Sequence, residues 1–196
     1  MKKVMIAAIA VVGFSVTGLA QQQVKFGPKA GVNLATISGN DDSEMKIGFH
    51  VGAVAEIKFN DKFSLQPEVL YSAQGGQLKE NSDIKMNNDY INIPIMAKYY
   101  FVEGFSVELG PQVGFLMKSE LKGNDGSVDT KDAHKSIDFG VGVGLAYDLP
   151  MGLFVNARYN IGLSKINEDI EAGPITVETD DVKNSVIQIG IGYKFD

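Results

Sequence analysis

The two histidines of this chain are its candidates for general-base chemistry near neutral pH. His50 lies in a run of alternating apolar and polar residues, and His134 stands two positions before Ser136. A histidine beside a serine hydroxyl is what a hydrolase needs, but no G-x-S-x-G turn surrounds this serine. The sequence also has no cysteine, so thiol nucleophiles and metal thiolates are excluded. We therefore predict no enzymatic activity and no cofactor.

Carboxylates are concentrated in the polar stretch 166–183, where Lys183 is the one basic residue. Hard cations such as Ca²⁺ prefer clustered carboxylate and carbonyl oxygens. Neither this stretch nor the segment 123–129 has the ligand spacing of a calcium loop. We therefore predict a solvated acidic surface and no metal site. The candidate acidic rim consists of Glu168, Asp169, Glu171, Asp180 and Asp181.

Other charged side chains occur inside segments that are otherwise apolar. Charges that leave water are tolerated only as pairs or networks. We predict an ion pair between Lys98 and Glu108 across the turn 102–104, and a contact between Arg158 and Glu68. We expect a structural role for this network. Its candidate members are Lys29, Glu56, Glu68, Lys98, Glu108 and Arg158.

The elements that must position these residues are strands, because apolar residues recur at every second position. In the segment 46–59, Ile47, Phe49 and Val51 alternate with Gly48 and His50. Successive side chains of a strand point to opposite faces, so one face is apolar and the other polar. The pattern predicts eight strands, at 24–38, 46–59, 63–74, 89–101, 105–118, 135–147, 153–165 and 184–195.

The connections between these strands alternate between short and long. The short ones, 60–62, 102–104 and 148–152, are rich in turn-forming residues, and Gly104 occupies the left-handed position of a three-residue hairpin. The long ones are the polar stretches 39–45, 75–88, 119–134 and 166–183. Short turns at one end and long loops at the other are typical of a bacterial outer-membrane barrel.

Aromatic residues separate this interpretation from a soluble barrel, in which the apolar face turns inward. They share the apolar face and gather near both ends of the strands, as a membrane interface on each side favours. We therefore predict an all-β, eight-stranded antiparallel up-and-down transmembrane β-barrel in the outer membrane. Its interior is too narrow for an aqueous pore and is filled by the polar face. A lipocalin-like carrier and a periplasmic sandwich are the soluble alternatives.

The N-terminus has the pattern of a secretory signal peptide. Lys2 and Lys3 precede an apolar run, and Gly18 and Ala20 stand at the positions of a cleavage site. We predict a signal peptide at 1–20 and a barrel domain at 21–196. Without the two lysines, the 18 basic residues become 16 against 24 acidic ones, a formal charge of −8. This charge disfavours binding to nucleic acid.

Several segments carry a resemblance to a known family. They are 26–34 (FGPKAGVNL), 65–72 (LQPEVLYS), 74–76 (QGG), 90–94 (YINIP) and 190–195 (GIGYKF). The chain resembles the outer-membrane β-barrel domain family that includes PorT-like proteins, common among Bacteroidota. The resemblance implies an eight-stranded barrel in the outer membrane, and the best-studied branch of the family is associated with protein secretion.

The leading functional hypothesis is a non-enzymatic barrel whose outer loops bind an envelope or extracellular ligand around a plugged lumen. The alternatives are a narrow channel or transporter for small solutes, an accessory component of a secretion system, and a lipid-modifying hydrolase. The expected partners are the lipid bilayer of the outer membrane and the barrel-assembly machinery. That machinery reads a final aromatic strand, here one that ends at Phe195 and Asp196.

Overall fold

The structure is a computed structural model of the chain. It describes residues 23–38, 43–78, 84–123, 126–131, 134–164, 170–172, 175–177 and 182–195. The signal peptide predicted at 1–20 lies outside these residues. In the described part of the chain, no helix has both the length and the apolar character needed to cross a membrane.

Twelve strands occur within the described residues. In chain order they are β1 (Gln23–Ser38), β2 (Ser43–Glu44), β3 (Lys46–Lys58), β4 (Phe63–Leu78), β5 (Lys85–Val102), β6 (Phe105–Gly123), β7 (Gly126–Asp129), β8 (Ile137–Asp148), β9 (Leu153–Gly162), β10 (Ile170–Ala172), β11 (Ile175–Val177) and β12 (Lys183–Tyr193).

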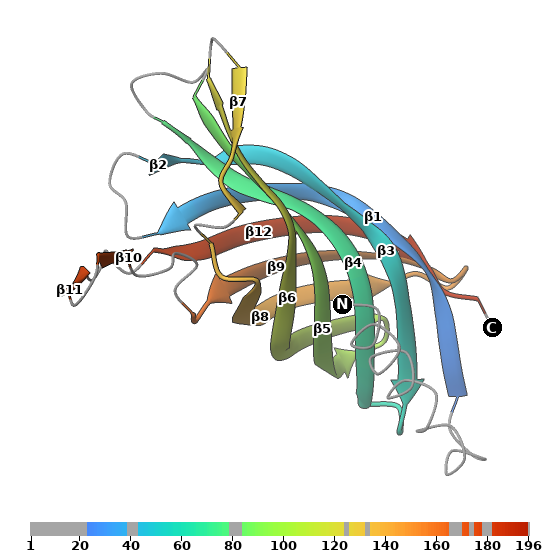
Figure 1. Cartoon of the computed structure of the whole chain (residues 1–196). Coiled ribbons are helices and arrows are strands. Elements are labelled where there is room, and N and C mark those ends of the chain that lie inside the picture. Colours follow the sequence, from blue (N-terminus) through green and yellow to red (C-terminus); the bar gives the residue numbers. More distant parts are fainter. Residues whose placement is uncertain are drawn as a thin grey trace.

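Eight of these strands close into an antiparallel barrel (Figure 1). The pairs run β1–β3, β3–β4, β4–β5, β5–β6, β6–β8, β8–β9 and β9–β12. The last strand, β12, then pairs with the first, β1, from Lys29↔Gly192 to Ser38↔Lys183. Closure satisfies the backbone groups that an open sheet edge would leave unpaired. The predicted all-β, eight-stranded up-and-down barrel is thereby confirmed.

The two faces of each strand differ as the alternation predicts. In β3, Ile47 is 75% exposed and Phe49 53%, whereas His50 and Glu56 on the other face are 1% and 0% exposed. The apolar side chains therefore lie outside and the polar ones inside. This is the arrangement of a barrel that meets lipid, and the reverse of a soluble carrier.

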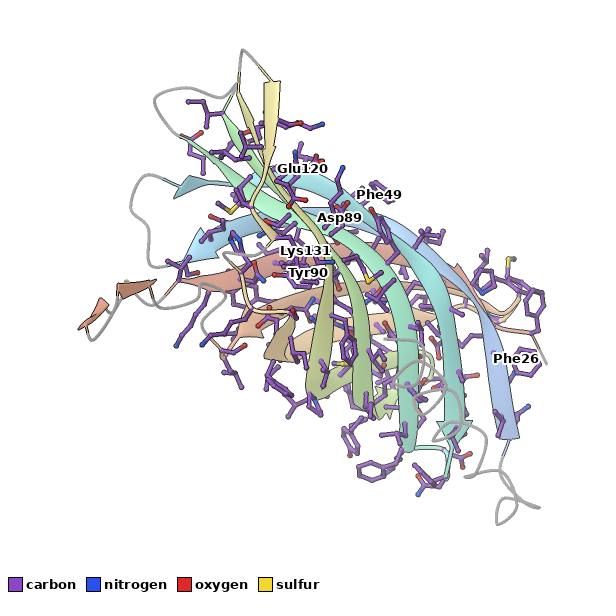
Figure 2. All side chains as sticks on the ribbon, in the orientation of Figure 1. Phe26, Phe49, Asp89, Tyr90, Glu120 and Lys131 are labelled. Carbon is purple, nitrogen blue, oxygen red and sulfur yellow. The ribbon has the colours of Figure 1, made fainter. Side chains whose placement is uncertain are left out.

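Aromatic rings gather near both ends of the outer surface. Phe63 and Tyr99 pack together near the short turns, with ring centroids 4.9 Å apart. Phe49 and Tyr71 do so near the long connections, at 5.8 Å. Figure 2 shows Phe26 and Phe49 pointing away from the barrel. Such rings mark the two membrane interfaces.

The short connections form tight turns at one end. Gly104 adopts φ 77° and Gly152 φ 87°, a backbone conformation that favours glycine. The Oδ1 atom of Asn60 accepts hydrogen bonds from the backbone N–H groups of Lys62 and Phe63, both at 2.9 Å. The left-handed position predicted for Gly104 is confirmed. Since short turns of outer-membrane barrels face the periplasm, this end is called the periplasmic end.

Three strands extend further at the opposite end than predicted. The prediction ended or began them at residues 74, 89 and 118, whereas β4 continues to Leu78, β5 starts at Lys85 and β6 reaches Gly123. Their polar residues predict loops, yet these segments pair as strands: Gln77 pairs with Lys85, and Lys85 pairs with Lys122. With β2 and β7 they form what we call the external sheet: 43–44, 74–78, 85–89, 118–123 and 126–129. It projects beyond the barrel in Figure 1.

Glycines on the inner faces provide room for large interior side chains. A Cβ atom at Gly192 would lie 2.4 Å from the Phe154 ring, and one at Gly142 would lie 3.1 Å from Cδ of Arg158. Both large side chains are buried at 1% exposure. The positions of glycines beside large inward side chains therefore determine how the lumen is filled.

Candidate functional site

Four charged residues form a cluster in the middle of the lumen, here called the central cluster. Arg158 on β9 donates from Nη2 to Oε1 of Glu68 at 2.8 Å and from Nη1 to Oε2 at 3.1 Å. Its Nε donates to Oε1 of Glu108 at 2.7 Å. Lys29 donates to Oε2 of Glu68 at 3.0 Å. Two cations thus balance two carboxylates, and the predicted contact of Arg158 with Glu68 is present.

The position of Arg158 follows from its neighbours in the sheet. It pairs with Gly144 on β8 and Gln188 on β12, so its inner-face neighbour on the β8 side has no side chain. The guanidinium therefore crosses the lumen to β4, where the Glu68 carboxylate accepts both ends of its planar fork. A bidentate arginine–carboxylate pair fixes orientation as well as charge.

A second group of charges, the periplasmic cluster, closes the lumen near the short turns. Lys98 lies 3.7 Å from Glu56 and 3.4 Å from Asp148. Lys194 contacts the same two carboxylates, at 2.5 Å and 2.8 Å. The hydroxyl of Tyr100 also contacts Glu56, and donates to Oδ2 of Asp148 at 2.7 Å. Two ammonium groups are thus shared by two carboxylates.

The predicted ion pair between Lys98 and Glu108 is wrong, although its register is correct. The two residues face each other across β5 and β6. Lys98 nevertheless contacts Glu56 and Asp148, and Glu108 accepts from Arg158. Side chains in a closed barrel reach across the lumen, so a direct cross-strand neighbour is one partner among several.

The sequence-based network left out three residues of the periplasmic cluster. The sequence places Asp148 in a turn and Lys194 at the end of the last strand, and it predicts no role for Tyr100. The alternation of each segment places all three residues on its inward face, and this is the sequence signal from which their role could be predicted. The 138-residue separation between Lys194 and Glu56 shows why it was missed, because the contact exists only once the barrel closes.

The two clusters make the interior a filled core. Lys29, Glu68, Glu108 and Arg158 each have 0% side-chain exposure, and so does Lys98. An aqueous pore along the lumen would wet such side chains, as it does in the much larger barrels of porins. The arrangement neutralises charge and holds the wall together.

Neither histidine forms an accessible nucleophile–base pair within the described residues. The Nδ1 atom of His50 lies 2.8 Å from Oδ1 of Asn33, deep in the lumen. The Nδ1 atom of His134 lies 2.8 Å from the carbonyl oxygen of Thr130 and 3.4 Å from the hydroxyl of Ser119. That serine is 0% exposed, so its hydroxyl is closed to a substrate.

The external sheet has a charged face and a more apolar face. On the charged face, Lys118 lies 2.8 Å from Glu120, and their hydrogen bond raises the pKa of Lys118. On the other face, Leu121 stands opposite Val128 in the ladder and is 39% exposed, while Val128 is 65% exposed. Figure 2 shows Glu120 near the base of this projection. The sheet thus presents exposed apolar side chains well away from the barrel wall.

Most of the predicted acidic rim lies outside the described residues, namely Glu168, Asp169, Asp180 and Asp181. The structure places Glu171 in the short hairpin of β10 and β11, opposite Thr176. The described part of the chain contains no group of three or more histidine or carboxylate side chains placed to hold a metal ion.

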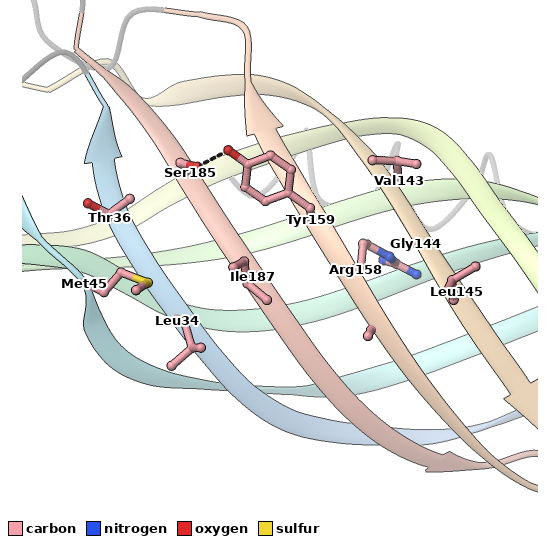
Figure 3. A pocket seen from close by; sticks show the side chains of 11 residues that line it. Leu34, Thr36, Met45, Val143, Gly144, Leu145, Arg158, Tyr159, Ser185 and Ile187 are labelled. Carbon is pink, nitrogen blue, oxygen red and sulfur yellow. Dashed lines mark hydrogen bonds between the residues drawn. The ribbon is translucent and has the colours of Figure 1, made fainter.

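One depression lies on the outer wall of the barrel and another at its periplasmic end. A groove of about 560 Å³ lies over β1, β12, β9 and β8 (Figure 3), and its apolar walls include Leu34, Tyr159 and Ile187. It belongs to the lipid-facing surface, where the Tyr159 hydroxyl lies 2.7 Å from that of Ser185. A second pocket, of about 490 Å³, opens at the periplasmic end.

Comparisons with known proteins agree with this architecture. Neisserial surface protein A has a structure similar to this chain, with a TM-score of 0.60 and 16% identity over 88% of this chain and 99% of its own. Ail, the attachment invasion locus protein of Yersinia pestis, crystallised with the heparin analogue sucrose octasulfate, gives 0.52 and 18% over the same shares. A search of curated proteins finds no significant match.

The family assignment comes from the sequence itself. A family model for the outer membrane protein beta-barrel domain matches residues 19–168, which is more than half of the chain. The lipid-facing apolar surface and the aromatic rings at both ends are what such a domain requires. The chain belongs to the outer membrane protein beta-barrel domain family, and it is located in the outer membrane.

Proposed function

We propose that this barrel is a non-enzymatic surface-binding protein whose external sheet contacts an extracellular or envelope ligand. The observation that carries the proposal is the projection of paired strands beyond the membrane-embedded wall. A barrel that served only to fill the membrane could end its strands in short loops. Here β4, β5 and β6 continue as a hydrogen-bonded sheet, and β2 and β7 widen it.

The surface of this sheet suits recognition. Exposed apolar side chains away from the bilayer have no lipid to cover them, and in soluble surroundings such residues mark interaction sites. Val128 and Leu121 lie in one cross-strand pair, and every residue of β7 is exposed. Paired strands also position these side chains more rigidly than a loop does, which lowers the entropic cost of binding.

The comparisons support this class of function. One structural neighbour is a surface protein by name, and another is an attachment protein that was crystallised with a heparin analogue. Their identities to this chain are 16% and 18%, so the ligand of this barrel follows from neither. A filled lumen argues for the surface as the working part, because a narrow solute channel needs a wet path through the central cluster.

The PorT-like affiliation and a role in secretion rest on the sequence segments that resemble that branch. We include in the proposal export by the signal peptide at 1–20, insertion by the barrel-assembly machinery, and a solvated acidic rim.

The test compares adhesion of cells that carry the chain with adhesion of cells that carry two variants. Surfaces coated with heparin and with serum proteins serve as probes. Val128→Glu places a charge in the exposed apolar pair of the external sheet, and Met151→Glu places the same charge in a periplasmic turn, where residue 151 is 64% exposed. We expect Val128→Glu to lower adhesion at least tenfold and Met151→Glu to leave it unchanged. Equal adhesion by both variants, with equal barrel content in the membrane, contradicts the proposal.

A further inference from the structure

The pocket at the periplasmic end is the mouth of the lumen on the side opposite to the external sheet. Its volume of about 490 Å³ lies within the range of small-molecule sites. The lining combines charged side chains of Lys25 on β1, of β3 and of Lys194, which follows β12, with apolar residues of the turn after β8. It includes Lys58, Lys194, Glu56, Asp148, Leu149 and Pro150.

The charges around this pocket are unevenly matched. Glu56 and Asp148 are each in contact with both Lys98 and Lys194, so the two carboxylates are neutralised by these two ammonium groups. Lys58 has no carboxylate within ion-pair distance among the described residues. Its ammonium lies 5.1 Å from the centre of the Tyr100 ring. The ring attracts the cation weakly and does not neutralise it.

The surroundings of Lys58 strengthen the electrostatic attraction between its ammonium and an anion. Lys58 is half-buried against the wall of a membrane-embedded barrel, where the effective dielectric constant is far below that of water. Glu103, also in the lining, is exposed on the turn 102–104 and is screened by water. Lys58 therefore supplies a half-buried positive charge to the pocket, whose lining also contains the half-buried ammonium of Lys25, which has an interaction of its own.

We propose that this pocket binds the oxyanion group of a small periplasmic molecule, a carboxylate or a phosphate, with Lys58 as its anchor. The apolar residues Leu149 and Pro150 contact the remainder of that molecule. The site is independent of the external sheet, so the barrel presents one binding surface to each side of the membrane. No bond is made or broken in this binding.

The experiment uses the full chain, purified from outer membranes and held in lipid nanodiscs. Inorganic phosphate and hexanoate are titrated separately, and isothermal calorimetry measures the dissociation constants. The phosphate arm tests the charged group alone, and the hexanoate arm adds an apolar tail. We expect saturable binding of at least one probe, and weakening of that binding by a factor of ten or more in Lys58→Gln.

Two further variants make the result specific. Lys62→Gln removes an exposed lysine at the same end, outside the pocket, and is expected to change binding less than twofold. Lys58→Arg keeps the charge and is expected to retain binding. A heat-dependent shift on a gel shows that each variant is folded. Absence of saturable binding for both probes, or equal binding by folded Lys58→Gln, overturns the proposal.

Discussion

Replacing Arg158 with methionine tests whether the central cluster stabilises the barrel. The four residues of this cluster carry two positive and two negative charges, and Arg158 supplies three of the hydrogen bonds among them. Among the described residues, methionine leaves Glu108 without an ion-pair partner and Glu68 with Lys29 alone. Both carboxylates have 0% side-chain exposure, so water cannot replace the guanidinium without opening the wall.

The expected magnitude follows from the cost of an uncompensated buried charge. Breaking a buried ion pair by removing one partner costs about 3–5 kcal/mol. We therefore expect Arg158→Met to lower the free energy of unfolding by about this amount. The double variant Arg158→Met/Glu108→Gln removes one charge of each sign and restores neutrality, so it is expected to recover most of the loss. The surface variant Lys62→Met serves as the control, with a change below about 0.5 kcal/mol.

The assay is reversible unfolding in urea with the barrel in lipid vesicles, followed on a gel by the heat-dependent shift of the folded band. A loss below about 1 kcal/mol for Arg158→Met would refute the reasoning, because a surface pair contributes that little. Failure of the double variant to recover stability would show that shape, and not charge balance, determines the effect.

Three further predictions concern the wall, the periplasmic cluster and the lumen. Gly144→Ala places a Cβ atom 2.5 Å from the backbone oxygen of Ala157, and we expect it to destabilise the barrel by about 1–3 kcal/mol in the same assay. In the control Gly123→Ala, the added Cβ atom meets nothing within 4 Å, so no effect on stability is expected. Tyr100→Phe removes a hydroxyl between two carboxylates and should cost about 1–3 kcal/mol on urea unfolding. In planar bilayers the barrel should show no steady conductance; a steady current from the unmodified protein would contradict the filled lumen.

Much of the fold could be predicted because strand period is a local property. The alternation of Ile47, Phe49 and His50 places each side chain on a face without knowledge of any partner. The turn at Gly104 was equally local. The extension of β4 to β6 was missed because polar residues such as Gln77 and Lys85 carry no apolar alternation, and only their neighbours reveal the pairing.

The site could be predicted less fully, because ion pairs depend on distances across the lumen. The contact of Arg158 with Glu68 was predictable from the glycines that leave space beside the arginine. The partner of Lys98 could not be predicted, because the carboxylates of Glu108, Glu56 and Asp148 all face the same lumen. The alternation along a strand identifies which charged residues face the lumen. The distances in the closed barrel determine which of them form ion pairs.

The contact of Lys194 with Glu56 has a consequence for how the chain reaches its folded state. Glu56 belongs to the second barrel strand and Lys194 follows the last, so the two meet only when β12 pairs with β1. Before closure, the Glu56 and Asp148 carboxylates at the periplasmic end lack the ammonium of Lys194, and closure supplies it. Pairing of β12 with β1 therefore closes the wall and completes the charge balance of the periplasmic cluster together.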